Sequence, residues 1–586
     1  MTLFDEANSP RTYDAIVIGS GITGGWAAKE LCEAGLKTLI LERGRHVEHG
    51  DYPTAALDPW DITGDNPDIF KIGTGHVAAM GDDNYTEEEE SHYHVQRRTG
   101  WSAKRTTARH YVDDLEHPYK DINGGRFDWI RGYQTGGRSL IWGRQSYRWA
   151  PIDFEMNARQ GIAIDWPIRY ADLEPYYAKV EDYIGVSGRP EGRHERLPDG
   201  VYSPPMELNA PEADFEQKIN EGLFGDGRYV TPGRVAHLTG EARPGRQLCQ
   251  YRNRCERGCP YGGYFSSNSS TLPAADLTGN LTLRPFSIVK ALNYDATRGR
   301  ATGVVVVDKE TKEEHEFTAK VIFLNASTAG SAAILMQSGD WANESDQLGR
   351  NIMDHHYSVG AKARVDGLEH LYFKGHKPNG YYMPQFVNRP GGGPQYKDFI
   401  RGWGIQGYGS REGWQRGIAE LRYGPEFKEE MFRPGEWRLM CSSFGETLPH
   451  PDNRMFLGEE LDQWGLPILS FDTRLRENEL LMRKAMGEVA YEMYERAGYR
   501  DVEIWEDEDY ALGLGIHEMG TARMGHDPRT SVLDAHNRVH AAKNVYCTDG
   551  AAMVSAGTVN PSLTYMAMTV RAVEHAVKAL AEGELG

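Results

Sequence analysis

The chain is poor in cysteine and carries fewer basic than acidic side chains. It has 6 cysteines in 586 residues, and 65 Lys and Arg against 85 Asp and Glu give a formal net charge of -20. Such an excess of negative charge repels a phosphate backbone, so we expect no nucleic-acid partner. Three of the cysteines, Cys32, Cys441 and Cys547, stand far apart, which speaks against a disulfide framework.

Long apolar runs are also missing. No uninterrupted apolar stretch reaches the length that crosses a bilayer, so we expect no membrane span. The first ten residues, MTLFDEANSP, contain acids and no apolar segment of the kind that a secretory signal needs, so we expect no signal peptide in this chain. Its 586 residues exceed what one hydrophobic core usually serves, and we expect two large domains.

A nucleotide-binding pattern opens the chain. An apolar strand is expected at residues 13–18, followed by Gly19, Gly21 and Gly24 and then by a helix. Glycines at this spacing permit a tight turn and a close approach to a pyrophosphate at the start of the helix. Glu42 ends the next expected strand, where a carboxylate can bind ribose hydroxyls. The pattern predicts a Rossmann-type dinucleotide site, without separating NAD from FAD.

Later segments favour FAD. Further cofactor contacts are expected from Gly136, Gly137, Ser139, Trp142, Asp549 and Gly550. The last eighty residues of the chain return to the nucleotide site, which suits a long cofactor that stays bound throughout the reaction. FAD is therefore the expected ligand.

The remaining cysteines form a cluster, Cys249, Cys255 and Cys259, with the spacing C-x5-C-x3-C-P and arginines in between. Basic neighbours are expected to lower the thiol pKa values and to offset the negative charge of an iron–sulfur cluster. Structural zinc prefers four ligands with a different spacing, and an apolar thiol loop is the third possibility. Three thiolates suit a [3Fe-4S] cluster, whereas a fourth ligand from Cys441 or Cys547 would allow a [4Fe-4S] cluster.

Several motifs occur in an order that resembles the glucose-methanol-choline (GMC) family of FAD-dependent oxidoreductases. They lie at residues 19–24 with Glu42, 135–139 with Trp142, 165–177, 348–355, 517–521, 524–525 and 560–561. The resemblance implies an α/β fold in which a Rossmann-type FAD-binding domain is interleaved with an α+β substrate domain built on a mostly antiparallel sheet. The expected ranges are 1–165, 240–352 and 505–586 for the FAD domain, which includes the thiol loop 249–260, and 166–239 and 353–504 for the substrate domain. Residues 373–403 are expected to help cover the flavin.

The resemblance also implies a catalytic pair, His517 and Asn560. A histidine near the flavin can take the hydroxyl proton of an alcohol while hydride leaves the carbon, and an amide partner can hold the substrate oxygen. The presence of both residues speaks against a flavin-fold scaffold without redox chemistry. His355, His356 and His540 are expected to be structural.

Non-covalent FAD is expected, because family members that attach FAD through histidine do so at the position that Ile141 occupies here. An iron–sulfur cluster takes one electron at a time, so a dehydrogenase is favoured over an oxidase.

Within the family the chain resembles the catalytic subunits of bacterial glucoside 3-dehydrogenases, which implies oxidation of a sugar C3 hydroxyl. It also implies a small partner subunit with a twin-arginine signal, a cytochrome c acceptor and a periplasmic location by co-export. Gluconate 2-dehydrogenase, fructose or sorbitol dehydrogenase and a pyranose-oxidase-like enzyme remain alternatives, as does a cytoplasmic location.

Overall fold

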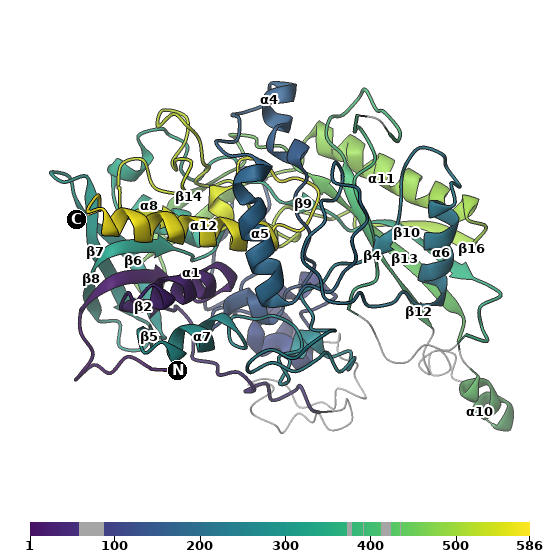
Figure 1. Ribbon diagram of the computed structural model, residues 1–586, viewed down its shortest axis with the longest axis horizontal. Coiled ribbons are helices and arrows are strands. Elements are labelled where there is room, and N and C mark those ends of the chain that lie inside the picture. The colour runs from purple at the N-terminus through teal and green to yellow at the C-terminus, as the bar shows by residue number, and fades with distance from the viewer. Residues whose placement is uncertain (58–86, 372–377, 391, 412–423, 434, 586) are drawn as a thin grey trace.

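Two large sheets lie side by side and form the framework of the protein (Figure 1). The computed structural model describes residues 1–57, 87–371, 378–390, 392–411, 424–433 and 435–585. Short helices in this part include α3 (Glu87–His92), α4 (Met156–Gln160) and α10 (Pro425–Phe432). Among its helices, none combines the length and apolar character that a bilayer crossing requires.

The first sheet has the order β5-β2-β1-β8-β7-β6, with β17 paired to β8. Its strands are β1 (Thr12–Ile18), β2 (Thr38–Leu41), β5 (Leu281–Arg284), β6 (Ser287–Asp295), β7 (Arg300–Asp308), β8 (Glu314–Leu324) and β17 (Val545–Cys547). β1 runs parallel to β2 and β8, β5 to β2, and β17 to β8, whereas β6, β7 and β8 are antiparallel. The carboxyl ends of the parallel strands therefore gather at one edge, where nucleotides bind in such folds.

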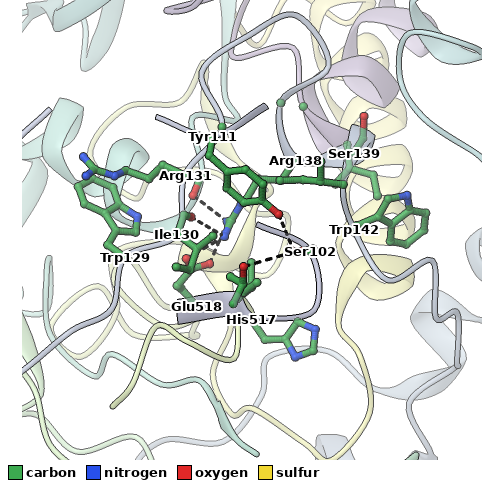
Figure 2. A pocket seen from close by; sticks show the side chains of 18 of the residues that line it. Ser102, Tyr111, Trp129, Ile130, Arg131, Arg138, Ser139, Trp142, His517 and Glu518 are labelled. Atoms are coloured by element: carbon green, nitrogen blue, oxygen red, sulfur yellow. Dashed lines mark hydrogen bonds and ion pairs between the residues drawn. The ribbon is translucent and has the colours of Figure 1, made fainter. Parts of the chain in front are cut away.

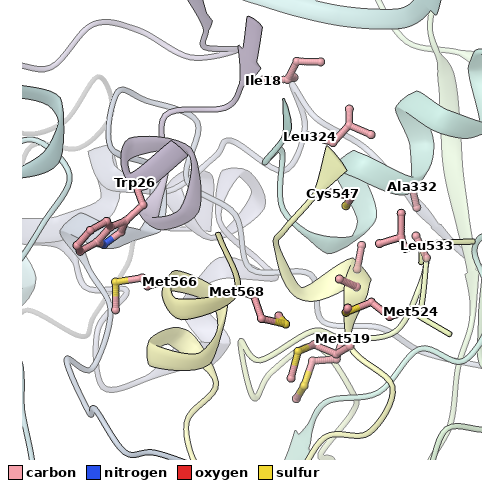
Figure 3. Close-up of a cluster of buried hydrophobic side chains, with 14 of the residues drawn as sticks. Ile18, Trp26, Leu324, Ala332, Met519, Met524, Leu533, Cys547, Met566 and Met568 are labelled. Atoms are coloured by element: carbon pink, nitrogen blue, oxygen red, sulfur yellow. The ribbon is translucent and has the colours of Figure 1, made fainter. Parts of the chain in front are cut away.

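Helices cover both faces of this sheet. They are α1 (Ile22–Glu33), α5 (Tyr170–Ile184), α7 (Thr271–Leu277), α8 (Thr328–Gln337) and α12 (Ser562–Ala581). Because successive strand residues point to opposite faces, Ala15 and Val17 of β1 pack in the layer with α1 and α12, whereas Ile16 and Ile18 pack in the layer with α8. Figure 3 shows part of the second layer, where Ile18 lies in one apolar cluster with Leu324 and Ala332.

The second sheet has the order β16-β10-β13-β12-β11-β4, with β9 paired to β13, and every pair in it is antiparallel. Its strands are β4 (Thr231–Pro232), β9 (His355–His356), β10 (Val359–Val365), β11 (Tyr381–Met383), β12 (Trp403–Arg411), β13 (Trp437–Glu446) and β16 (Arg500–Glu506). Helices α6 (Ala210–Asn220) and α11 (Glu477–Arg496) pack against it. The expected fold, a nucleotide-binding sheet beside an antiparallel substrate-domain sheet, is confirmed.

A small third sheet joins β3 (Lys120–Asp121), β14 (Arg454–Leu461) and β15 (Pro467–Asp472). The expected domain ranges stay predictions, but two elements from the range given to the substrate domain pack on the nucleotide side. Tyr177 of α5 shares a hydrogen bond of 2.8 Å with Thr564 of α12, and the turn between β14 and β15 packs against β6 and β7. Residues 373–377 and 391 of the expected flavin cover lie outside the described residues.

Candidate active site

A cavity of about 1230 Å³ lies where the strand ends of the first sheet meet the second sheet. The turn after β1 forms one wall. Gly19 has φ +96°, and a side-chain carbon on it would stand 2.4 Å from the carbonyl oxygen of Asn325. A side-chain carbon on Gly24 would stand 1.9 Å from the Gly19 carbonyl oxygen, whereas one on Gly21, which lines the cavity, would meet nothing within 4 Å. The backbone is thus packed tightly behind the turn and open in front of it, as a pyrophosphate site requires.

Glu42 faces the same cavity from the end of β2. The side chain is 5 % exposed, and its carboxylate accepts hydrogen bonds from the N–H groups of Ser20 (3.1 Å) and Gly44 (2.9 Å) and from the Ser20 hydroxyl. Burial raises the pKa of Glu42, whereas these donors lower it. The carboxylate is held in place beside the turn, where a ribose would lie.

The second glycine segment meets the first. Gly136 has φ +88° and donates its N–H to the Ser20 hydroxyl (2.9 Å), and a side-chain carbon on Gly137 would stand 3.4 Å from the Gly21 Cα. The Ser139 hydroxyl donates to the Gly136 carbonyl at 2.6 Å. The two glycine segments, residues 19–24 and 136–139, therefore form one continuous wall of the cavity, which we call the cradle. They are more than a hundred residues apart in the chain.

The chain end completes the cradle. Asp549 accepts hydrogen bonds from the Ser331 hydroxyl (2.5 Å) and the Ala551 N–H (3.0 Å), and burial raises its pKa to about 6. A side-chain carbon on Gly550 would stand 2.1 Å from the Glu518 carbonyl oxygen. Of the expected FAD contacts, the structure brings all but Gly24 and Gly136, which lie behind the turns, to the cavity surface. The donors and the tight turns fit FAD, and the individual contacts stay predictions.

His517 and Asn560 lie together on the cavity wall, 3.3 Å apart between Nε2 and the amide Nδ2. Gln406 of β12 donates its amide N–H to the Asn560 Oδ1 at 2.6 Å. Because that oxygen is occupied, the Asn560 NH2 group faces His517 and the cavity. Gln406 was not expected from the sequence, which holds no pattern that links it to Asn560.

His355 fixes the proton position on His517. Its Nε2 lies 3.1 Å and 3.0 Å from the carbonyl oxygens of Ala556 and Gly557, so this nitrogen carries a hydrogen and donates it. The Nδ1 of a neutral His355 is then an acceptor, and it lies 2.8 Å from the Nδ1 of His517. His517 therefore carries its hydrogen on Nδ1 and presents an unprotonated Nε2 to Asn560 and the cavity.

Both rings are neutral. Burial lowers the pKa of His355 to about 4, and burial together with the nearby His355 and Arg138 lowers the pKa of His517 well below its usual range. The fold places His355 against the ring of His517, a neighbour that the expectation of a structural role did not include. His540, by contrast, hydrogen-bonds Ser531 (2.9 Å) away from the cavity, and its structural role stays a prediction.

Asp354 organises the loop that carries His517. Its carboxylate accepts N–H groups from His517 (3.0 Å), Gly513 (2.8 Å), Gly515 (2.9 Å) and His355 (2.8 Å). Asp354 and His355 both belong to the 348–355 motif. That motif was the signal in the sequence that could have pointed to them.

An ion pair links this loop to the second glycine segment. Glu518 is 3 % exposed and makes two 2.8 Å contacts with Arg138, which also donates to the Ile130 carbonyl at 3.2 Å (Figure 2). The bidentate geometry fixes both segments relative to one another.

Aromatic rings line the part of the cavity near His517. Tyr357 stacks on Phe444 of β13 at 5.2 Å and 6°, and both line the cavity with Tyr408 and Trp101. Tyr408 is 45 % and Trp101 43 % exposed. Flat aromatic faces beside the Gln406 amide suit a substrate with both apolar faces and hydroxyl groups.

The thiol loop borders the same cavity. Cys249, Cys255 and Cys259 are free and half-buried, and Cys255 lines the cavity. Arg144, also on its wall, lies 3.3 Å from the Glu256 carboxylate and 5.2 Å from the ring centre of Tyr264. Of the three thiols, Cys255 therefore stands on the wall of the cavity that holds the nucleotide turn and His517.

The expectation of lowered thiol pKa values is wrong for Cys249 and Cys255. Burial raises the pKa of Cys255 to about 12, and it raises that of Cys249 as well. The interleaved arginines point elsewhere, because Arg252, Arg254 and Arg257 donate to the carbonyl oxygens of Ala55, Ala56 and Leu57. The Arg144 cation lowers the pKa of the Cys255 thiol, but burial outweighs it.

Neither proposed fourth ligand reaches the loop. Cys441 packs in the core of the second sheet, and Cys547 lies in the first sheet beside Asp549. Within the ranges that the structure describes, no three His, Cys, Asp or Glu side chains stand together as a metal-binding group. The donor set, three free thiols on one loop, fits an iron–sulfur cluster chemically, but the thiols are not already arranged around a metal.

The chain is similar to known oxidoreductases over most of its length. Two models, both described as GMC oxidoreductase, match residues 236–357 and 449–569. The fructose dehydrogenase large subunit of Gluconobacter japonicus is 25% identical over 98% of this chain and 100% of its own length. The 2-methyl-1,2-propanediol dehydrogenase of Mycolicibacterium austroafricanum is 25% identical over 96% of this chain and 94% of its own, and the gluconate 2-dehydrogenase flavoprotein of Pantoea cypripedii is 22% identical over 96% and 93%. The crystal structure of pyridoxine 4-oxidase from Mesorbium loti shares the fold, with a TM-score of 0.56 and 17% identity over 96% of this chain and 98% of that one.

Proposed function

We propose that this chain, which belongs to the GMC oxidoreductase family and is an FAD-dependent enzyme acting on CH–OH groups, is a sugar dehydrogenase. Its proposed substrate is a glucoside, oxidised at the C3 hydroxyl to a 3-keto sugar. Gluconate 2-dehydrogenase and fructose or sorbitol dehydrogenase activities are the alternatives within the same reaction class. The single observation that carries the reaction type is the neutral His517 whose unprotonated Nε2 stands beside the Asn560 amide.

Each side chain of the site has its own role in the proposed alcohol oxidation. FAD, when bound, supplies the acceptor for the hydride that leaves the carbinol carbon. His517 Nε2 takes the hydroxyl proton, and the Asn560 NH2 group donates to the substrate oxygen as negative charge develops on it. Gln406 holds the Asn560 amide in the orientation that this donation needs. The FAD is proposed to be non-covalent, because Ile141 offers no nucleophile.

A sugar is favoured by the composition of the cavity wall. Tyr408, Trp101 and Tyr357 provide flat faces for the C–H side of a pyranose, and Gln406 provides a polar edge for its hydroxyls. The relatives named for fructose and gluconate support a sugar or sugar acid as the substrate class.

The electron route is proposed to lead through the thiol loop to an external acceptor. Cys249, Cys255 and Cys259 would hold a [3Fe-4S] cluster, with the loop at the cavity wall within reach of the flavin site. Because burial keeps the Cys255 thiol protonated, assembly must release that proton, and the nearby Arg144 cation favours the charged product. A cytochrome c is the proposed acceptor.

The assembly and location follow from the same proposal. One relative is named as a large subunit, which supports a partner subunit here. We assign to that partner a twin-arginine signal, and to the complex a periplasmic location by co-export. If no partner exists, a cytoplasmic enzyme follows.

The test combines anaerobic flavin reduction with product analysis. A methyl glucoside should bleach the FAD of the purified protein, and the product should carry a carbonyl at C3 by NMR. His517→Ala should slow the bleaching by about two to four orders of magnitude, whereas His540→Ala, a histidine away from the cavity, should leave it unchanged. Bleaching by gluconate or fructose but not by the glucoside would assign the alternative substrates. Rapid reoxidation by oxygen with hydrogen peroxide release, and none by cytochrome c, would make the protein an oxidase.

A further inference from the structure

The turn between β14 and β15, residues 462–466, closes one end of the cavity. The Asp462 carboxylate accepts the N–H groups of Trp464 (2.9 Å) and Leu466 (3.0 Å). Gly465 has φ +76°, a conformation that favours glycine. These bonds give the turn a fixed shape, and Asp462 and Leu466 line the cavity together with Glu42 and Arg43.

Trp464 at the tip of this turn anchors it to the nucleotide side. Its ring is 7 % exposed and stacks on His117 at 5.1 Å and 19°. Its N–H donates to the Lys309 carbonyl at 2.9 Å, and the ring packs with Ile288 and Val307 of the first sheet. The turn therefore rests on the FAD-binding side of the molecule, although it joins two strands of the small third sheet.

Arg43 completes the arrangement. Its guanidinium lies 5.5 Å from the Trp464 ring centre, 4.8 Å from that of Tyr133 and 3.7 Å from the Asp462 carboxylate. Arg43 directly follows Glu42, the residue at the ribose position. The turn is thus held by an ion pair and by aromatic contacts beside the place where the nucleotide half of FAD is expected.

Arg43 and His117 line this end of the cavity beside Glu42. Burial and the cations Arg43, Arg131 and Lys309 lower the pKa of His117, so its ring is neutral. A cation and a neutral ring next to the Glu42 carboxylate suit a ligand with polar ring edges and ribose hydroxyls.

We propose that Arg43 and His117 bind the adenosine end of FAD, and that Trp464, on the 462–466 turn, is the positioning residue that holds both against it. The turn acts as a clasp over the nucleotide end of the cofactor. This role lies outside the glycine motifs and the Glu42 position, and it holds whichever alcohol the enzyme oxidises.

The experiment measures the affinity of the apoprotein for FAD, ADP and FMN in Trp464→Ala and in wild type. Loss of the stacking contact should weaken FAD and ADP about tenfold, since such contacts contribute on that order. FMN, which has no adenosine, should bind equally to both proteins. Trp464→Phe should restore most of the affinity, and Trp101→Ala, at the substrate end of the same cavity, should leave all three affinities unchanged.

Unchanged FAD and ADP affinities in Trp464→Ala would overturn the proposal, and so would an equal loss for FMN, which would indicate a general disturbance. If Trp464→Ala does not fold, Arg43→Gln replaces it, with the same pattern expected and the same results contradicting it. These affinities are measured without any sugar. A failure of the clasp is therefore distinguished from a failure of the proposed sugar oxidation, which the bleaching of wild-type FAD tests.

Discussion

The hydrogen bond between His355 and His517 allows a sharp test of what fixes the proton position on His517. His355→Leu removes the acceptor for the His517 Nδ1 hydrogen while keeping a buried side chain of similar size. His355→Gln is the matched variant, because its amide oxygen can accept from His517 and its NH2 group can donate to the Ala556 and Gly557 carbonyls.

The magnitude follows from the buried donor. Without an acceptor the His517 Nδ1 hydrogen is unsatisfied against the fully buried position of residue 355, which costs about 1–3 kcal/mol. His517 then favours the tautomer that carries the hydrogen on Nε2, which cannot take a proton from the substrate. We expect His355→Leu to slow flavin reduction by about five- to 150-fold, because each 1.4 kcal/mol is a factor of ten in rate. His355→Gln should stay within about fivefold of wild type.

The assay is anaerobic stopped-flow bleaching of FAD by saturating sugar, with FAD content checked for each variant. A purely structural histidine would give similar losses in the two variants, through lower FAD content or lower stability. Equal rates for the Leu and Gln variants, at full FAD loading, would refute the assignment of the proton to His517 Nδ1.

Further outcomes are expected from the cradle, the thiols and the histidines. Gly24→Ala should abolish FAD retention, because its side-chain carbon would stand 1.9 Å from the Gly19 carbonyl oxygen; yellow protein with a full flavin complement would contradict the tight packing. Cys255→Ser should lose iron and cytochrome reduction but keep single-turnover bleaching, whereas less than about one iron atom per chain in anaerobic wild type would end the cluster proposal. Because burial lowers the pKa of His517, flavin reduction should stay on its plateau as pH falls through about 6.5, and a loss centred there would show a solvated histidine. His355, with a pKa near 4 when folded and about 6.5 when unfolded, binds more protons in the unfolded chain, so the free energy of unfolding should fall between these values as pH is lowered, less so in His355→Gln.

The sequence by itself determined the nucleotide turn, and its resemblance to the GMC family predicted the two kinds of sheet and a catalytic role for His517 and Asn560. Strand periodicity and glycine spacing are local, so residues 13–24 specify a strand, a tight turn and a helix without help from the rest of the chain. His517 and Asn560 could be named because motif order along the chain marks them, and the fold then brings their side chains to 3.3 Å.

Tertiary structure alone decided which neighbours those residues have. His355 and Gln406 reach the pair from 162 and 154 residues away in the chain, a separation at which no periodicity links two positions. The thiol pKa values also depended on packing, because the loop arginines turn to backbone carbonyls and burial then governs Cys255. Likewise, the β14–β15 turn joins two strands of the small third sheet but buries Trp464 on the first sheet, against apolar side chains of β6 and β7. Burial of that ring depends on which surfaces meet in three dimensions, and neither local pattern nor motif order records this.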